Sequence, residues 1–161
     1  MTASRHLDIL RFTIRCALAA SLLLISSQSP ALAGPGPSDA PSTAGTDLDY
    51  AQVKHVDVIQ STDGTWCIYT TVRHHDEGVG HYANAWQALD QDGNEVAWRL
   101  LAHPHVYEQP FERDECRVSV PSSVTALVVR ARCNVHGFGS VHVEVDMSTP
   151  AGENFTVVRK K

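Results

Sequence analysis

The 161-residue sequence lacks several features that define common protein classes. Its longest apolar run, residues 16–25, is too short to cross a membrane, which takes about 20 residues. Thirteen Lys and Arg stand against 18 Asp and Glu, a net charge of −5. Without a basic excess the chain has little to neutralise phosphates, which argues against nucleic-acid binding. There is neither a Gly-rich phosphate loop followed by a helix nor a G-x-S-x-G nucleophile motif.

The first 33 residues have the pattern of a secretory signal peptide. Three arginines precede the apolar run, and residues 31–33 (Ala-Leu-Ala) form an A-x-A cleavage site. Cys16 lies at the start of the apolar run and not beside the cleavage site, so we expect no lipid anchor there. Residues 34–46 are rich in Pro, Gly and Ser, which predicts a flexible linker. The sequence therefore predicts Sec-type export into the periplasm or the medium.

The remainder reads as one all-β domain, residues 47–157, with a basic tail at 158–161. Short alternating or β-branched runs are separated by turn signals such as Thr62-Asp63-Gly64. The predicted strands are residues 54–60, 66–75, 81–90, 95–102, 115–120, 126–133 and 141–147. Seven strands at this spacing, without long helical periodicity, predict an immunoglobulin-like or fibronectin-like sandwich.

Histidine is unusually frequent in the domain, which holds eight of the nine in the chain. Successive strands of such a sandwich run antiparallel, so the loops after the second, fourth and sixth strands lie at one end. Those three loops carry most of the histidines, and His55 opens the first strand. The sequence therefore predicts a histidine-rich end formed by His74, His75, His81, His103, His105 and His136.

Cys133 and His136 form the most specific pair. They lie three residues apart on a tight turn that ends at Gly137, so both can reach one metal ion. The alternation of residues 126–133 places Cys133 on the apolar face at the end of its strand. A thiolate would be shielded there, and a bound metal would account for it.

Together these motifs resemble the iron-binding domain of superoxide reductases, the desulfoferrodoxins and neelaredoxins, over about residues 53–137. The matching elements are Lys54-His55, His75, His81 with Tyr82 and Trp86 behind it, and Cys133-Asn134-Val135-His136-Gly137. The chain departs from the family pattern at Val53, where the family has glutamate, and at Asp76, where it has proline. Residues 103–111 have no counterpart.

The resemblance implies an immunoglobulin-like fold and a mononuclear iron site that reduces superoxide to peroxide. It assigns the metal ligands to His55, His75, His81, His136 and Cys133. It assigns to Lys54 the role of attracting the anionic substrate. An outside electron donor must re-reduce the iron, and the sequence does not identify it.

Several alternatives stay open at this point. His74 could replace His75 as a ligand, because adjacent strand residues face opposite sides. His103 and His105 could form a second metal site or support the first. Because Cu²⁺ outcompetes Fe²⁺ at most nitrogen and sulfur sites, the same end could bind copper or zinc for storage or delivery, without turnover. The protein could also be an interaction module with incidental histidines.

The exported chain would contain three cysteines, and an odd number leaves one unpaired. If Cys133 binds the metal, Cys67 and Cys116 can form a disulfide. The alternative pairs Cys116 with Cys133, which leaves Cys67 free and the metal site with histidines alone.

Overall fold

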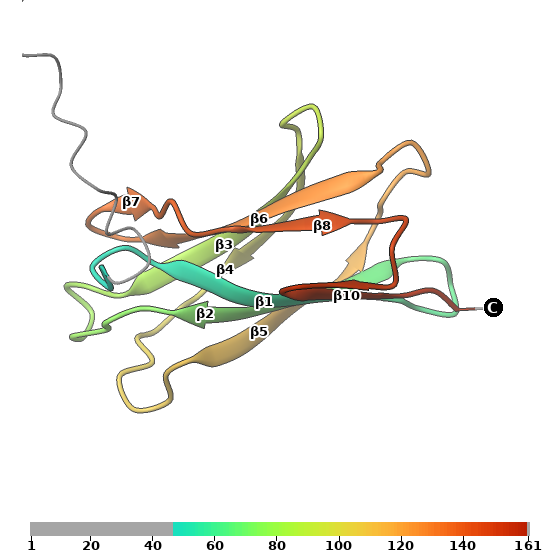
Figure 1. Cartoon of the computed structure of the whole chain (residues 1–161). Helices are drawn as coiled ribbons and strands as arrows, with labels where there is room; N and C mark the ends of the chain where they lie inside the picture. Colours follow the sequence, from blue (N-terminus) through green and yellow to red (C-terminus); the bar gives the residue numbers. More distant parts are fainter. Residues whose placement is uncertain (1–46, 161) are drawn as a thin grey trace, which may run out of the picture. The chain divides into compact units, whose positions relative to one another are not determined.

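A computed structural model of the protein describes residues 47–160, and all regular structure within them is β. The proposed signal peptide and linker lie outside the described residues. Two five-stranded sheets form the layers of a sandwich (Figure 1). Within residues 47–160 there is no helix with the length and hydropathy needed to span a membrane.

The first sheet has the order β5-β2-β1-β10-β9. Its strands are β1 (Gln52–Gln60), β2 (Trp66–Arg73), β5 (Phe111–Val118), β9 (Ala151–Gly152) and β10 (Phe155–Val158). The second sheet has the order β4-β3-β6-β7, and β8 also pairs with β6. Its strands are β3 (Ala83–Asp90), β4 (Glu95–Leu100), β6 (Ala126–Cys133), β7 (Gly137–Phe138) and β8 (Val143–Asp146). All pairings are antiparallel except that of β1 with β10.

The prediction of an all-β sandwich is confirmed. The predicted ranges correspond to β1–β6 and β8, while β5 begins earlier than expected, at Phe111, because Val72 of β2 pairs with it. The structure adds β7, β9 and β10. The first two have two residues each, too few to show a periodicity, and the four residues of β10 are defined by their pairing with β1.

The core lies between the sheets and follows the period of two of the strands. In β2 the residues Trp66, Ile68, Thr70 and Val72 are buried, and in β6 every second residue from Leu127 to Cys133 is buried. Burying one such apolar side chain contributes about 1.5–3 kcal/mol to stability. A disulfide joins Cys67 of β2 to Cys116 of β5, which leaves Cys133 as the free cysteine of the described residues.

Strand direction gives the sandwich two distinct ends. One end, which we call the site end, carries the loops 74–82, 101–110 and 134–136 and the segment 47–51 before β1 (Figure 1, left). Their proximity follows from the register, which pairs Val72 with Phe111 and Ala83 with Cys133. The opposite end, the turn end, carries the turns 61–65, 91–94, 119–125 and 147–150.

Candidate metal centre

Three potential metal ligands converge at the site end. His74, His81 and Cys133 each offer a ligand atom, and these atoms lie within 4.8 Å of one another. Among residues 47–160 they are the group of His, Cys, Asp and Glu that meets this condition. His136 lies against the group, with Nδ1 3.7 Å from the Cys133 sulfur and its ring centroid 5.0 Å from that of His81.

Cys133 is the last residue of β6 and is completely buried. The backbone N–H of Val135 donates to its sulfur at 3.4 Å. Gly137, at φ +78°, adopts the left-handed conformation that ends the turn. This turn brings the His136 ring back towards the Cys133 sulfur.

The structure places His74 in the cluster and His75 outside it. His74 continues the buried row of β2, and its side chain is fully buried, whereas His75 is exposed. The chain stays extended for two residues beyond β2, so the side chains of His74 and His75 still point to opposite sides. The sequence indicates this position for His74, because His74 is an even number of residues from Ile68 and Val72 and so lies on the same face of the strand.

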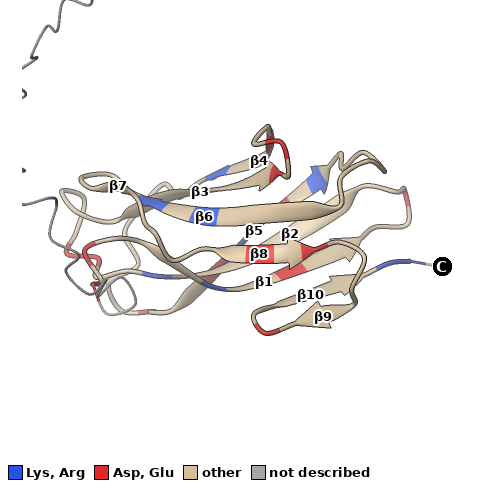
Figure 2. Ribbon diagram, turned by 45° about the horizontal axis from the view of Figure 1, so that its top comes forward, with Lys and Arg blue, Asp and Glu red and all other residues tan. Residues whose placement is uncertain are grey.

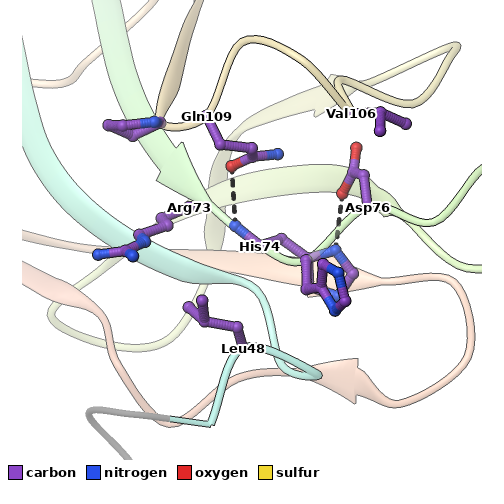
Figure 3. A pocket seen from close by; sticks show the side chains of 8 residues that line it. Leu48, Arg73, His74, Asp76, Val106 and Gln109 are labelled. Carbon is purple, nitrogen blue, oxygen red and sulfur yellow. Dashed lines mark hydrogen bonds and ion pairs between the residues drawn. The ribbon is translucent and has the colours of Figure 1, made fainter.

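Asp76 fixes the orientation of the His74 ring. The Nδ1–H of His74 donates to the carboxylate at 2.7 Å, and the backbone N–H groups of Ala83 and His105 donate to it at 3.0 and 2.6 Å. Burial alone would raise the pKa of Asp76, but these three hydrogen bonds together hold it below its usual value. The bond to His74 is visible in Figure 3.

Glu77 orients His81 in the same way. The Nδ1–H of His81 donates to Glu77 at 2.7 Å, a bond that raises the pKa of His81 and lowers that of Glu77. The opposite nitrogen, Nε2, is buried and has no hydrogen-bond partner among the described residues. A buried unsatisfied nitrogen is costly, and a metal ion would satisfy it.

The donor set fits a transition metal. Metal-bound histidines commonly donate their other ring N–H to a carboxylate, as His74 and His81 do in this cluster. Imidazoles and a thiolate suit iron, copper or zinc. The sequence alone did not predict these supporting roles of Asp76 and Glu77, although Asp76 shares the parity of His74.

Other predicted site residues lie apart from the cluster. His55 is half-buried in β1, where its Nε2 lies 3.2 Å from Asp57 and its backbone pairs with Thr71. Lys54 beside it is exposed. A bulge between Val53 and His55 shifts the register of this stretch.

The two histidines of the loop 101–110 also lie outside the cluster of His74, His81 and Cys133. The buried His105 stacks on Phe111 with ring centroids 3.9 Å apart, and its Nδ1 lies 2.6 Å from Glu108. His103 is exposed, with its ring 4.6 Å from that of His105. His105 therefore packs inside this loop, and His103 lies at its surface.

A pocket of about 440 Å³ lies on another side of His74 (Figure 3). The residues that line it include Leu48, Arg73, His75, Val106 and Gln109. The Gln109 side-chain oxygen accepts a hydrogen bond from the backbone N–H of His74 at 3.0 Å. The loop 101–110 thus helps to hold the backbone of the candidate ligand.

Fold and cluster together define an all-β sandwich with a candidate His/Cys metal centre. No protein-family model matches the chain. It is 33% identical over 120 residues to a protein of Halomicrobium mukohataei described as "Putative lipoprotein", a match that spans 73% of this chain and 59% of that protein. The chain thus corresponds to about three fifths of that relative.

Two solved structures are similar in part. A variant of the superoxide reductase (neelaredoxin) of Archaeoglobus fulgidus in the reduced form matches with a TM-score of 0.40 and 14% identity, over 59% of this chain and 89% of that one. The superoxide reductase (1Fe-SOR) of Giardia intestinalis matches with a TM-score of 0.38 and 15% identity, over 59% and 98%.

Proposed function

We propose that this is an exported metalloprotein that holds one transition-metal ion with His74, His81, His136 and Cys133. With iron in the site, it reduces superoxide to peroxide. The observation that carries the metal centre is the buried, unpartnered Nε2 of His81 beside a buried free thiol and a second carboxylate-bound imidazole. The reaction is supported by the sequence likeness of residues 133–137 to the superoxide reductase motif.

The residues of the chain divide the work. Asp76 and Glu77 hold two imidazoles with Nδ1 protonated, which leaves Nε2 of each as the metal-binding atom. Iron bound there would supply the electron that reduces superoxide. The exposed His136 and Val135 border the cluster, so a small anion and its protons can reach it from solvent. Lys54, which is exposed near the start of β1, would attract the anion.

Export of the protein is supported by the amino-terminal sequence, by the relative and by the disulfide. Residues 1–33 have the pattern of a signal peptide. The Halomicrobium relative is described as "Putative lipoprotein", and a disulfide such as Cys67–Cys116 belongs to an oxidising compartment. The mature protein would begin at Gly34, with an immunoglobulin-like domain over residues 47–157.

A second candidate function is the binding or delivery of copper or zinc. It is favoured by the position of His55, which lies outside the cluster and leaves three imidazoles and one thiolate. Four such ligands are the number that zinc takes in structural sites, and copper also binds imidazole and thiolate.

The test is the metal content of the exported chain, purified without a histidine tag. About one iron per chain, a thiolate-to-iron charge-transfer band in the oxidised form and consumption of superoxide would support the first function. Cys133→Ser should abolish the band, while the exposed control His142→Ala should keep it. Stoichiometric copper or zinc without turnover would support the second function, and a metal-free protein that binds none of the three would contradict both.

A further inference from the structure

The segment 47–50, which precedes β1, places one backbone oxygen against the histidine cluster. The carbonyl oxygen of Asp49 lies 3.0 Å from Nε2 of His74 and 2.9 Å from Nδ1 of His136. These rings come from two different loops, 74–82 and 134–136. Two candidate metal ligands therefore converge on a single oxygen atom that the sequence did not single out.

The hydrogen-bond count of His74 makes this contact informative. Both ring nitrogens face oxygen acceptors, with the Asp76 carboxylate at 2.7 Å and the Asp49 carbonyl at 3.0 Å. A neutral imidazole has one N–H, so it can donate to only one of them. If Nδ1 donates to Asp76, the lone pair of Nε2 faces the lone pairs of the carbonyl in a buried place. A cation bound by both Nε2 and the oxygen would turn that repulsion into coordination.

The distances fit coordination as well. Donor atoms about 2.1 Å from a metal ion, at right angles to one another, are about 3.0 Å apart. The Asp49 oxygen has this separation from both imidazole nitrogens. We propose, building on the metal centre proposed above, that the backbone carbonyl oxygen of Asp49 is a further ligand of the metal. The centre then has five donors, with the Asp49 oxygen in addition to three imidazoles and the thiolate.

The segment is fixed in place by contacts independent of any metal. The buried side-chain amide of Gln52 donates to the Asp47 carbonyl at 3.0 Å, and the backbone N–H of His75 donates to the Leu48 carbonyl at 3.0 Å. The Tyr50 ring packs against His136 with centroids 5.3 Å apart. These contacts hold the Asp49 carbonyl on the cluster before a metal arrives.

The experiment uses Co²⁺ as the probe on the whole exported chain. Amide hydrogen exchange, read by mass spectrometry, should slow in peptides covering residues 47–52 when Co²⁺ binds. Gln52→Ala frees the segment and should weaken Co²⁺ binding about 10- to 100-fold, with a change in the d–d absorption bands. Gln87→Ala is the matched control, because Gln87 is buried in β3 and bonds to Arg130 and Glu95. This control should leave the affinity unchanged.

The outcomes separate this inference from the proposed function. Co²⁺ that binds with a thiolate charge-transfer band, but leaves exchange in residues 47–52 unchanged, would overturn the Asp49 ligand and leave the metal centre standing. A chain that binds no Co²⁺ would overturn both. If Gln52→Ala does not fold, the exchange of the unsubstituted chain decides the question.

Discussion

The two ends of the sandwich use carboxylates in different ways. Acidic residues lie in the loops of both ends (Figure 2). At the turn end, Asp63, Asp90 and Asp146 accept hydrogen bonds from the backbone of their own turns, for example from Ser148 N–H to Asp146 at 2.8 Å. At the site end, Asp76 and Glu77 accept hydrogen bonds from imidazoles, and Asp76 accepts from the backbone N–H groups of Ala83 and His105 as well. The same residue type thus builds turns at one end and orients candidate ligands at the other.

The sharpest test of the comparison replaces the two adjacent histidines one at a time. His74→Ala should abolish stoichiometric metal binding, because it removes a buried ligand, and His75→Ala should leave it intact, because His75 is exposed outside the cluster. Metal titration of both variants, followed by the charge-transfer band, measures the effect. Equal loss in the two variants would contradict the assignment of His74.

Asp76→Ala should have the next largest effect. It leaves the ring of His74 and two backbone N–H groups without their acceptor in a buried place, which costs about 3–5 kcal/mol of unfolding free energy. Urea denaturation of the metal-free protein measures it. The turn-end control Asp146→Ala should lose much less, since Asp146 is exposed. A similar loss in both variants would remove the distinction between the ends.

Glu77→Gln should affect the metal more than the fold. The side chain of Glu77 is 59% exposed, so its replacement leaves no buried group unpaired. It weakens the bond that orients His81, and metal affinity should fall about 10-fold. Thermal melting of the metal-free protein should change little. An unchanged metal affinity would contradict the role of Glu77 in orienting His81, and so would a loss of most of the stability of the metal-free protein.

The smallest effect concerns acid stability. Because the folded pKa of Asp76 lies below its ordinary value of 3.8, its ionised form stabilises the fold above about pH 3.8. This contribution is lost as the pH falls through the lowered folded value. The stability gap between the unsubstituted protein and Asp76→Asn should therefore be full at pH 7 and shrink below pH 3.8. Urea midpoints at about pH 7, 4 and 3 would show it. If the stability difference between the two proteins did not depend on pH, the hydrogen bonds to the ionised Asp76 could not be its cause.

Much of the site end could be predicted from sequence because it follows from strand order. The period of two placed Cys133 on the buried face of β6, and the antiparallel alternation of strands gathered six histidines in three loops. The sequence did not decide between His74 and His75, because the decision depends on which face of the chain stays buried beyond Val72. The place of His55 required the pairing of β1 and its bulge, which depend on long-range contacts.

The contact of Asp49 could not be predicted from residue types. Every residue has a carbonyl oxygen, and only the path of the segment before β1 brings this one to His74 and His136. Strand β10 could not be predicted either, because its four residues become a strand only beside the Val56–Ile59 stretch of β1. Tertiary pairing determined these features.

The disulfide between Cys67 and Cys116 has a consequence for the denatured chain. It closes a ring with a sequence separation of 49, which restricts the unfolded chain and is worth about 4 kcal/mol by loop-closure entropy. His74, Asp76 and His81 are inside this ring, whereas Cys133 and His136 lie beyond it. A metal bound by both groups would act as a second cross-link, tying the ring to a part of the chain that the disulfide leaves free.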